Sequence, residues 1–95
     1  MTKSELIDAL AERRSMPRQM AESVVNTIFD QMQRALIDGE RIEIRGFGTF
    51  KVRHYKGYLG RNPRNMQPIE VPPKRLPVFK PSRLMEARLN ASLKG

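Results

Sequence analysis

The sequence has no cysteine, a single histidine and no long apolar run. Without cysteine the chain forms no disulfide and offers no thiolate ligand to a metal. No apolar segment approaches the roughly 20 residues of a membrane span, and the first residues lack the apolar region of a signal peptide. No matched base or nucleophile accompanies His54 in a catalytic arrangement. We therefore expect a soluble, intracellular protein that is not an enzyme and uses no metal or other cofactor.

Acidic residues are almost absent from the second half of the chain. Residues 1–50 hold seven Lys/Arg and eight Asp/Glu, whereas residues 51–95 hold eleven Lys/Arg and two Asp/Glu. The net charge is therefore −1 in the first half and +9 in the second. A charged run often serves only as a solvated face, but a mixture of both signs would do that equally well. The imbalance favours a surface that binds a polyanion.

Two extended basic runs near the middle of the chain flank a segment rich in turn-forming residues. Phe50 and Val52 alternate with Lys51 and Arg53, which is the two-residue period of a strand. Three prolines interrupt the return run: Pro68, Pro72 and Pro73. Because proline has no N–H to donate, this strand cannot lie inside a wide sheet. A projecting two-stranded ribbon tolerates these prolines, and we expect one over about residues 53–76.

The first half of the chain has the pattern of two helices. Thr2 and Glu5 form a capping box that starts a short amphipathic helix. Ser15-Met16-Pro17 ends it, and Pro17 suits the first position of a second helix that runs to about Ile37 and stops at Asp38-Gly39. The apolar stripe of the second helix is wider than one short helix can cover: Met20, Ala21, Val24, Val25, Ile28, Phe29, Met32, Ala35 and Leu36.

The size of the chain points to a partner subunit. If about twenty residues project as a ribbon, about seventy-five remain to build a core, which is marginal for a monomer. The wide stripe on the second helix then predicts a dimer interface. We expect residues 1–50 to form a helical dimerisation body together with the first strands.

A hairpin is expected after the second helix. Glu40 to Arg45 alternate polar and apolar residues, which predicts a strand, and Gly46-Phe47-Gly48 is the turn into the next one. We expect Phe47 and Phe50 to pack into the core. The third glycine of a G-x-G-x-x-G nucleotide motif would fall at Lys51, and no helix follows, so this motif is excluded.

A last helix is expected over about residues 82–93. Ser82 is its cap, and it carries a narrow apolar stripe of Met85, Leu89 and Leu93 that can close over the dimer body. The predicted fold class is α+β: two N-terminal helices, a short antiparallel sheet with a long protruding two-stranded ribbon arm, and a C-terminal helix. The whole chain forms a single domain.

Four segments resemble the bacterial HU/IHF family, the histone-like and integration-host-factor proteins. They are Met1 to Ile7, Ile42 to Phe50, Gly60-Arg61-Asn62-Pro63 and Phe79-Lys80-Pro81. The resemblance covers essentially the whole chain and is most specific at Gly60 to Pro63. It implies an intertwined dimer, with itself or with a paralogous subunit, whose two arms embrace duplex DNA from the minor-groove side. HU and IHF are themselves established examples of this mechanism, in which an apolar wedge kinks the duplex.

The resemblance also implies a nucleoid-associated protein of the bacterial cytoplasm, which bends and condenses DNA.

Phosphate contacts supply affinity without sequence information. The candidates for them are Arg45, Lys51, Arg53, Lys56, Arg61, Arg64, Lys74, Arg75, Lys80 and Arg83. Arg61 and Asn62 also suit the floor of the minor groove, although Asn62 is equally well explained as a turn residue. Pro63 is the expected intercalating residue, since its ring is rigid and apolar; outside this family it would be an ordinary turn proline.

The chain departs from the family pattern at two places. A short Thr-Gly turn usually follows the tip proline, but the matching residues here are Asn65 and Met66. Asn65 tolerates a positive φ, so a turn is still expected there, in the same register or shifted by one residue. The Pro-Gly before the last helix is replaced by Pro81-Ser82, where the serine also serves as a cap.

Two other functions compete with duplex binding. A module that binds anionic membranes would need a basic amphipathic helix, but the basic residues lie on extended, proline-broken segments. A binder of single-stranded RNA would need exposed aromatic side chains for base stacking, and Tyr55 and Tyr58 could supply them. The RNA-binding function is the stronger of the two alternatives.

Overall fold

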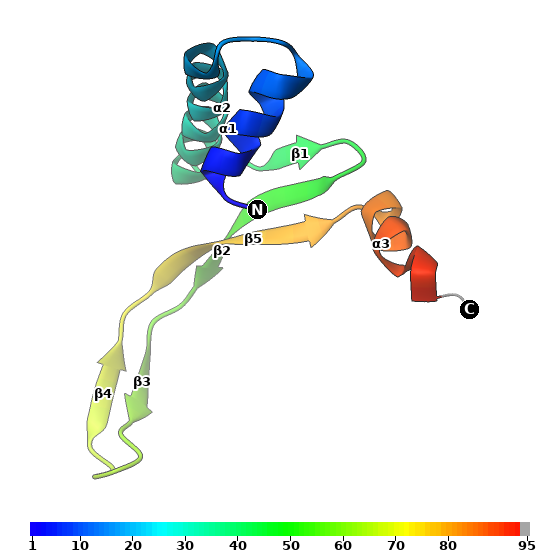
Figure 1. The fold of residues 1–95 in the computed structure, drawn as a ribbon. Helices are drawn as coiled ribbons and strands as arrows, with labels where there is room; N and C mark the ends of the chain where they lie inside the picture. Colours follow the sequence, from blue (N-terminus) through cyan, green and yellow to red (C-terminus); the bar gives the residue numbers. More distant parts are fainter. Residues whose placement is uncertain (94–95) are drawn as a thin grey trace.

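A computed structural model describes residues 1–93 and shows an α+β fold (Figure 1). The helices are α1 (Lys3–Arg13), α2 (Arg18–Ile37) and α3 (Arg83–Asn90), the last followed by a short 3-10 turn at Ala91–Leu93. The strands are β1 (Ile42–Ile44), β2 (Gly48–Tyr55), β3 (Tyr58–Arg61), β4 (Pro68–Val71) and β5 (Lys74–Pro81). The predicted fold class and order of elements are confirmed. No helix in residues 1–93 is long and apolar enough to cross a membrane.

The first two helices pack against each other as a pair. The Thr2 hydroxyl accepts a hydrogen bond of 3.1 Å from the Glu5 N–H, as the capping box predicts. Pro17 is the N-cap of α2 and not its first helical residue, because its ψ of 144° is extended. Its carbonyl nevertheless accepts the first helical bond from Ala21 at 3.1 Å. Arg18 of α2 links the two helices, since its guanidinium donates hydrogen bonds to Asp8 at 2.8 Å and to Ser4 at 3.0 Å, both on α1.

The core of the single chain is small. Among the described residues, the buried apolar side chains are Ile7, Ala21 and Val25, all between α1 and α2. Much of the predicted stripe on α2 stays open: Ile28 and Phe29 are 52% and 41% exposed, whereas Met32, Ala35 and Leu36 are half-buried. The radius of gyration is 19.6 Å, whereas about 12 Å is usual for a compact domain of this length. This chain cannot bury its own apolar surface.

Two antiparallel sheets follow one another along a single hairpin. The first has the order β1-β2-β5 and the second consists of β3 and β4. The prolines of the return run lie on β4, on the edge strand β5, and between these two strands at Pro72-Pro73. The central strand β2 has no proline. This is the distribution that the missing N–H groups require. Between the two sheets Pro72-Pro73 interrupts the ladder, so β3 and β4 project as a separate arm (Figure 1).

The turn between β1 and β2 is tight, and β1 is shorter than the predicted strand over 40–45. Gly46 has a φ of +80°, and the buried Gly48 lies against β5, where a Cβ would be 2.5 Å from the Lys80 carbonyl oxygen. The prediction that Phe47 packs into the core is wrong for the single chain, because Phe47 is 42% exposed. Its ring instead packs beside those of Phe50 and Phe79, with centroids 6.4 and 5.2 Å away.

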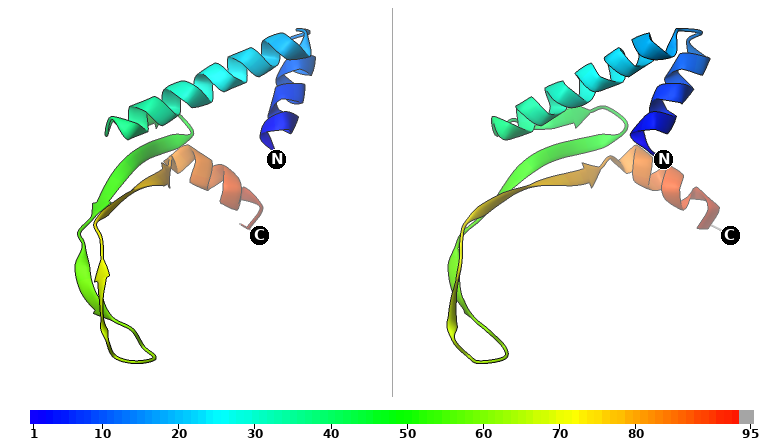
Figure 2. Two further views of the ribbon diagram at one scale, coloured as in Figure 1. Left: turned by 90° about the vertical axis from the view of Figure 1, so that its left-hand side faces the viewer. Right: turned by 60° about the vertical axis from the view of Figure 1, so that its left-hand side comes forward.

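The last helix extends away from the helical pair (Figure 2). The Ser82 hydroxyl accepts from the Met85 N–H at 3.1 Å, so the predicted cap is confirmed. The helix ends at Asn90, three residues earlier than predicted, and continues as the 3-10 turn. Leu89 and Leu93 on its stripe are 69% and 76% exposed, so among the described residues only the start of α3 packs against the sheet, where Leu84 lies over Gly46 and Met85 is half-buried.

Candidate nucleic-acid interface

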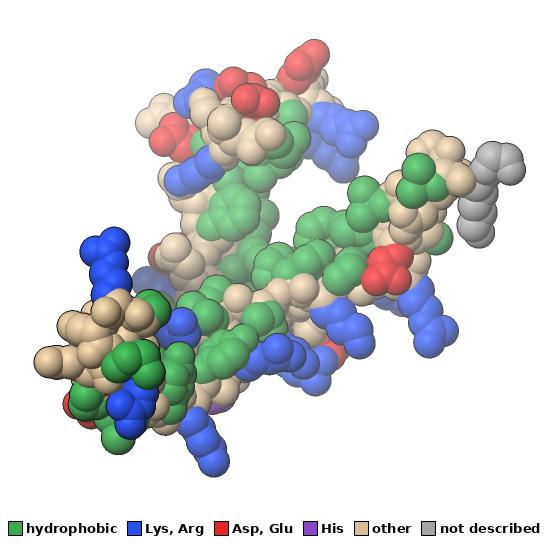
Figure 3. Space-filling model, turned by 90° about the horizontal axis from the view of Figure 1, so that it is seen from below, with side chains coloured by type: hydrophobic (Ala, Val, Ile, Leu, Met, Phe, Trp, Pro, Cys, Tyr) green, Lys and Arg blue, Asp and Glu red, His purple; other side chains and the backbone are tan. Residues whose placement is uncertain are grey.

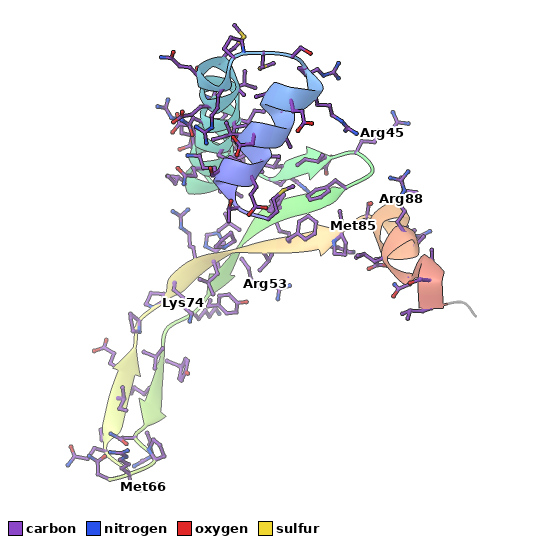
Figure 4. The ribbon with its side chains drawn as sticks, viewed as in Figure 1. Arg45, Arg53, Met66, Lys74, Met85 and Arg88 are labelled. Carbon is purple, nitrogen blue, oxygen red and sulfur yellow. The ribbon has the colours of Figure 1, made fainter. Side chains whose placement is uncertain are left out.

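The register of β2 and β5 assigns their side chains to two faces of the sheet. Phe50 lies opposite Phe79, and Val52 lies opposite Pro77, on the face that looks toward α2. The alternate positions point the other way. They bring together Lys51, Arg53, Lys74 and Lys80, which are all exposed. We call this set the basic face; Arg53 extends from it on the side away from α1 and α2 (Figure 4).

The positive charge of the basic face is not neutralised locally. In the part of the chain that the structure describes, the ion pairs within 4.0 Å join Arg18, Arg34 and Arg41 to carboxylates. None involves the basic face or the arm. Viewed from below, Lys and Arg side chains project from the arm and from the underside of the sheet, with few acidic side chains among them (Figure 3). Such a surface attracts a polyanion.

A hollow of about 650 Å³ lies beside the basic face, between the β1–β2 turn and the start of α3. Its lining includes Lys51 and Lys80 from the sheet, Arg45 from the turn and Ser82 at the α3 N-terminus. The N–H groups of a helix N-terminus favour an anion, so the hollow suits a phosphate. Arg41 also lines the hollow. Sequence reasoning missed this residue because an acidic residue lies nearby: the Arg41 Nε is 3.2 Å from the Glu43 carboxylate.

The arm holds the next group of predicted site residues. Lys56, Arg61, Pro63 and Arg64 are all exposed on it. Together the sheet and the arm form an arch, and its concave side lies under the sheet, away from α1 and α2 (Figure 2). The basic face is thus continuous with the inside of an arch that ends at Pro63.

The loop at the arm tip is held by side-chain hydrogen bonds. The Asn62 Oδ1 accepts from the Arg64 N–H at 2.9 Å, which is a turn role for that amide. One Arg61 nitrogen donates to the Met66 carbonyl at 3.1 Å. The turn expected at Asn65 and Met66 is present, and its positive φ falls one residue later than Asn65, on Met66, at +58°. The Asn65 Oδ1 instead accepts from the Gln67 N–H at 3.0 Å.

Arg75 does not belong to the basic face. It pairs with His54, at the positions of β2 and β5 that face α2. Its guanidinium donates a 3.2 Å hydrogen bond to the carbonyl of Ile37, the last residue of α2. Sequence alone could not reveal this, since the face of Arg75 depends on which residue of β2 it pairs with. Arg83, by contrast, is exposed in the first turn of α3, close in sequence to the hollow.

The two exposed tyrosines differ in their surroundings. Tyr55 lies opposite Lys74 at the base of the arm. The Tyr58 ring lies against Gly60, two residues further along β3: a Cβ at Gly60 would be 3.4 Å from Tyr58 Cε2. Tyr58 is nevertheless 64% exposed, whereas Tyr55 is 38% exposed. No group of three potential metal ligands occurs among residues 1–93.

Comparison with known proteins agrees with this geometry. The family model described as "Bacterial DNA-binding protein" matches residues 1–90. Integration host factor subunit beta of Alkalilimnicola ehrlichii is 44% identical over 92 residues, which cover 96% of this chain and 92% of that protein. The same subunit of Herminiimonas arsenicoxydans is 47% identical over 92 residues, covering 96% and 91%.

Solved structures of HU share the fold. The chain in the Anabaena HU–DNA cocrystal structure has a TM-score of 0.81 and 32% identity, covering 94% of this chain and 97% of that one. HU from Thermotoga maritima has a TM-score of 0.66 and 26% identity, covering 94% and 98%. The expectation that the protein is not an enzyme agrees with these relatives. The chain therefore belongs to the bacterial DNA-binding protein family of HU and IHF.

Proposed function

We propose that the chain is one subunit of a dimeric architectural protein that grips the minor groove of duplex DNA with its arms and bends the duplex at Pro63. The observation that carries this proposal is the arch: exposed, unneutralised cations line the underside of the sheet and continue along an arm with Pro63 at its end. The Anabaena HU relative was crystallised with DNA. A protein with this role works at the nucleoid, in the bacterial cytoplasm.

The candidate residues divide by position into three groups. Phosphate contacts come from the sheet, the hollow, the arm base and the first turn of α3: Arg45, Lys51, Arg53, Lys56, Lys74, Lys80 and Arg83. Arg61, Asn62 and Arg64 surround the tip, where they reach the groove floor and its flanking phosphates. Pro63 is the wedge. Arg75 supports the arm through α2 rather than by contacting DNA.

Bending is favourable if the flanking duplex gains contacts. Unstacking a base step costs a few kcal/mol. A kinked duplex can return along both sides of the protein, where the hollow offers Arg45, Lys51, Lys80 and the N-terminus of α3, beside the Arg41–Glu43 ion pair. These contacts form only when the duplex is bent, so they offset the cost of unstacking.

The apolar surface left open by the single chain is the dimer interface. It lies on α2, on the aromatic cluster of β2 and β5, and on α3, and it includes Ile28, Phe29, Phe47, Phe79 and Leu89. A second subunit with the same fold covers these side chains and places a second arm opposite the first. The relatives are described as the beta subunit of integration host factor. The partner is accordingly a paralogous subunit or a second copy of this chain.

Two binding experiments test the proposal. In a competition assay at fixed salt, unlabelled duplex DNA should displace a labelled duplex at lower concentration than single-stranded RNA of equal length. In a ligation assay, DNA of about 100–150 bp, near one persistence length, circularises poorly unless it is bent, and the protein should raise the yield of circles. Preferential binding of RNA would favour the alternative function, and no gain in circles would exclude bending.

A further inference from the structure

Hydrogen bonds close the tip loop of the arm at its base and within it. The Asn62 N–H donates to the Gln67 carbonyl at 2.9 Å, and the Met66 N–H donates to the Asn62 carbonyl at 2.8 Å. The Asx bonds of Asn62 and Asn65 close the turns inside the loop. Pro63 and Met66 are therefore held in the same short loop at the far end of the arm, where Figure 4 shows Met66.

Met66 is an unusual residue for its backbone conformation. Its φ of +58° lies in the left-handed region, where glycine or asparagine is favoured and a residue with a long side chain is strained. Asparagine stands next to it at position 65, yet methionine occupies the strained position. The Met66 side chain is 61% exposed, so burial within the free chain does not offset the strain. A strained residue that packing does not explain suggests a role in function.

The chemistry of the Met66 side chain fits an exposed base step. Methionine is unbranched, flexible and polarisable, and it fills irregular apolar gaps. It is also one of the apolar side chains that insert between base pairs in minor-groove proteins. Arg61 and Arg64, on either side of Pro63, bring the loop toward the phosphates. A rigid proline ring can open a base step, but it is too small to cover the faces of both bases.

We propose that Met66 is a second wedge residue, which packs against the base faces that Pro63 opens in the minor groove. This inference rests on the proposed function, since it requires the arm tip to enter the groove of a kinked duplex. The ligand that Met66 recognises is the apolar face of an unstacked base pair. Met66 therefore contributes binding free energy only when the duplex is bent. It contributes none when the protein contacts the phosphates of straight DNA.

A glycine variant separates this role from a purely structural one. Met66→Gly removes the side chain and relieves the strain at φ +58°, so the free loop becomes easier to form. We expect it to bind a short duplex about tenfold more weakly, as lost burial of a large apolar side chain requires. Leu59→Ala, which removes a 77% exposed side chain from the arm shaft, is the matched control and should change the affinity less than twofold. Equal or tighter binding by Met66→Gly would overturn the inference.

A chemical footprint gives an independent readout. Hydrogen peroxide transfers one oxygen atom to a methionine thioether and leaves water, and exposed thioethers react fastest. Peptide mass spectrometry should show that duplex DNA slows sulfoxide formation at Met66, while added N-acetylmethionine reacts at an unchanged rate. Equal oxidation of Met66 with and without DNA would contradict insertion.

The outcomes distinguish the two proposals. If the wild-type protein does not bend a duplex, the proposed function fails and the role of Met66 fails with it. If the wild-type protein bends DNA, and Met66→Gly binds as tightly as wild type while Met66 oxidises freely in the complex, only the role of Met66 is overturned. Weaker binding by Met66→Gly together with protection of Met66 supports both.

Discussion

The guanidinium of Arg75 donates a 3.2 Å hydrogen bond to the carbonyl of Ile37. Arg75 is the second residue of β5, at the base of the arm, and Ile37 is the last residue of α2. The bond therefore joins the arm to the helical body. It also places a cation at the C-terminus of a 20-residue helix, where the helix dipole favours positive charge.

This bond separates Arg75 from the cations of the basic face. Arg75→Ala should lower the free energy of unfolding by about 1 kcal/mol, since it removes a hydrogen bond and a favourable charge at the helix end. Urea unfolding at fixed protein concentration measures this. The salt dependence of DNA binding should be nearly unchanged in the same variant. A clearly shallower salt dependence would show that Arg75 contacts a phosphate.

Lys51→Ala should behave in the opposite way. If the dimer neutralises about eight phosphates, log K falls with log salt at a slope of about −7. Lys51→Ala removes one contact per copy of this chain, so the slope should become shallower by about 2 for a homodimer and by about 1 for a heterodimer. Binding should weaken similarly on all sequences, because phosphates carry no sequence information. Titrations at several salt concentrations measure the slope, with Arg34→Ala as the control, since Arg34 is paired with Asp30 on α2. An altered sequence preference at an unchanged slope would mean that Lys51 reads bases.

Gly48 should not tolerate a side chain. A Cβ there would meet the Lys80 carbonyl oxygen at 2.5 Å and the Phe79 ring at 2.6 Å. Because one of these neighbours is backbone, β5 must shift, and Gly48→Ala should cost about 2–3 kcal/mol in urea unfolding. Gly60→Ala is the control, since the nearest neighbour of its Cβ would be the Tyr58 ring at 3.4 Å, with Val71 and Ile69 at 3.9 and 4.0 Å. Equal stabilities of the two variants would contradict the tight packing of β2 on β5.

The exposed face of α2 should control assembly. Sedimentation equilibrium of the wild-type chain, alone or mixed with a paralogous subunit, should give a dimer at micromolar concentration. Ile28→Lys places a charge on this face and should abolish the dimer, because burial of an unpaired charge is costly. Leu59→Lys carries the same change on the arm and should leave the dimer intact. A folded wild-type monomer under these conditions would refute the assignment of the interface.

Several elements could be predicted from the sequence because their signals are local. Thr2 and Ser82 act as caps through bonds to residues three positions away, and the alternation of Phe50 and Lys51 sets their faces within one strand. Candidate site residues on β2 rested on the same short-range patterns, whereas the role of Pro63 at the tip rested on the family resemblance. Pro17 was misassigned by only one residue, since a proline suits either side of a helix start.

The remaining features depend on contacts between distant residues. The face of Arg75 follows from its pairing with His54. Pro72-Pro73 interrupts the strand before Arg75, so the alternation of residues along the sequence does not predict this pairing. The 42% exposure of Phe47 fits the proposed dimer interface, which a second subunit would complete. The positive φ of Met66 follows from the hydrogen bonds that close the tip loop, and these override the local preference of Asn65 for such a conformation.

The central claim, bending by a proline wedge, is tested most directly by energy transfer between dyes at the two ends of a short duplex. Pro63→Ala keeps every charge, so the electrostatic share of affinity should survive, whereas a methyl group should hold a base step open less well than the rigid ring. We predict a marked fall in energy transfer relative to wild type and a smaller loss of affinity. On DNA that is nicked at the kink, the loss of affinity should be smaller still, because less unstacking is needed. Equal energy transfer for the two proteins would contradict the account and leave Pro63 as a turn residue.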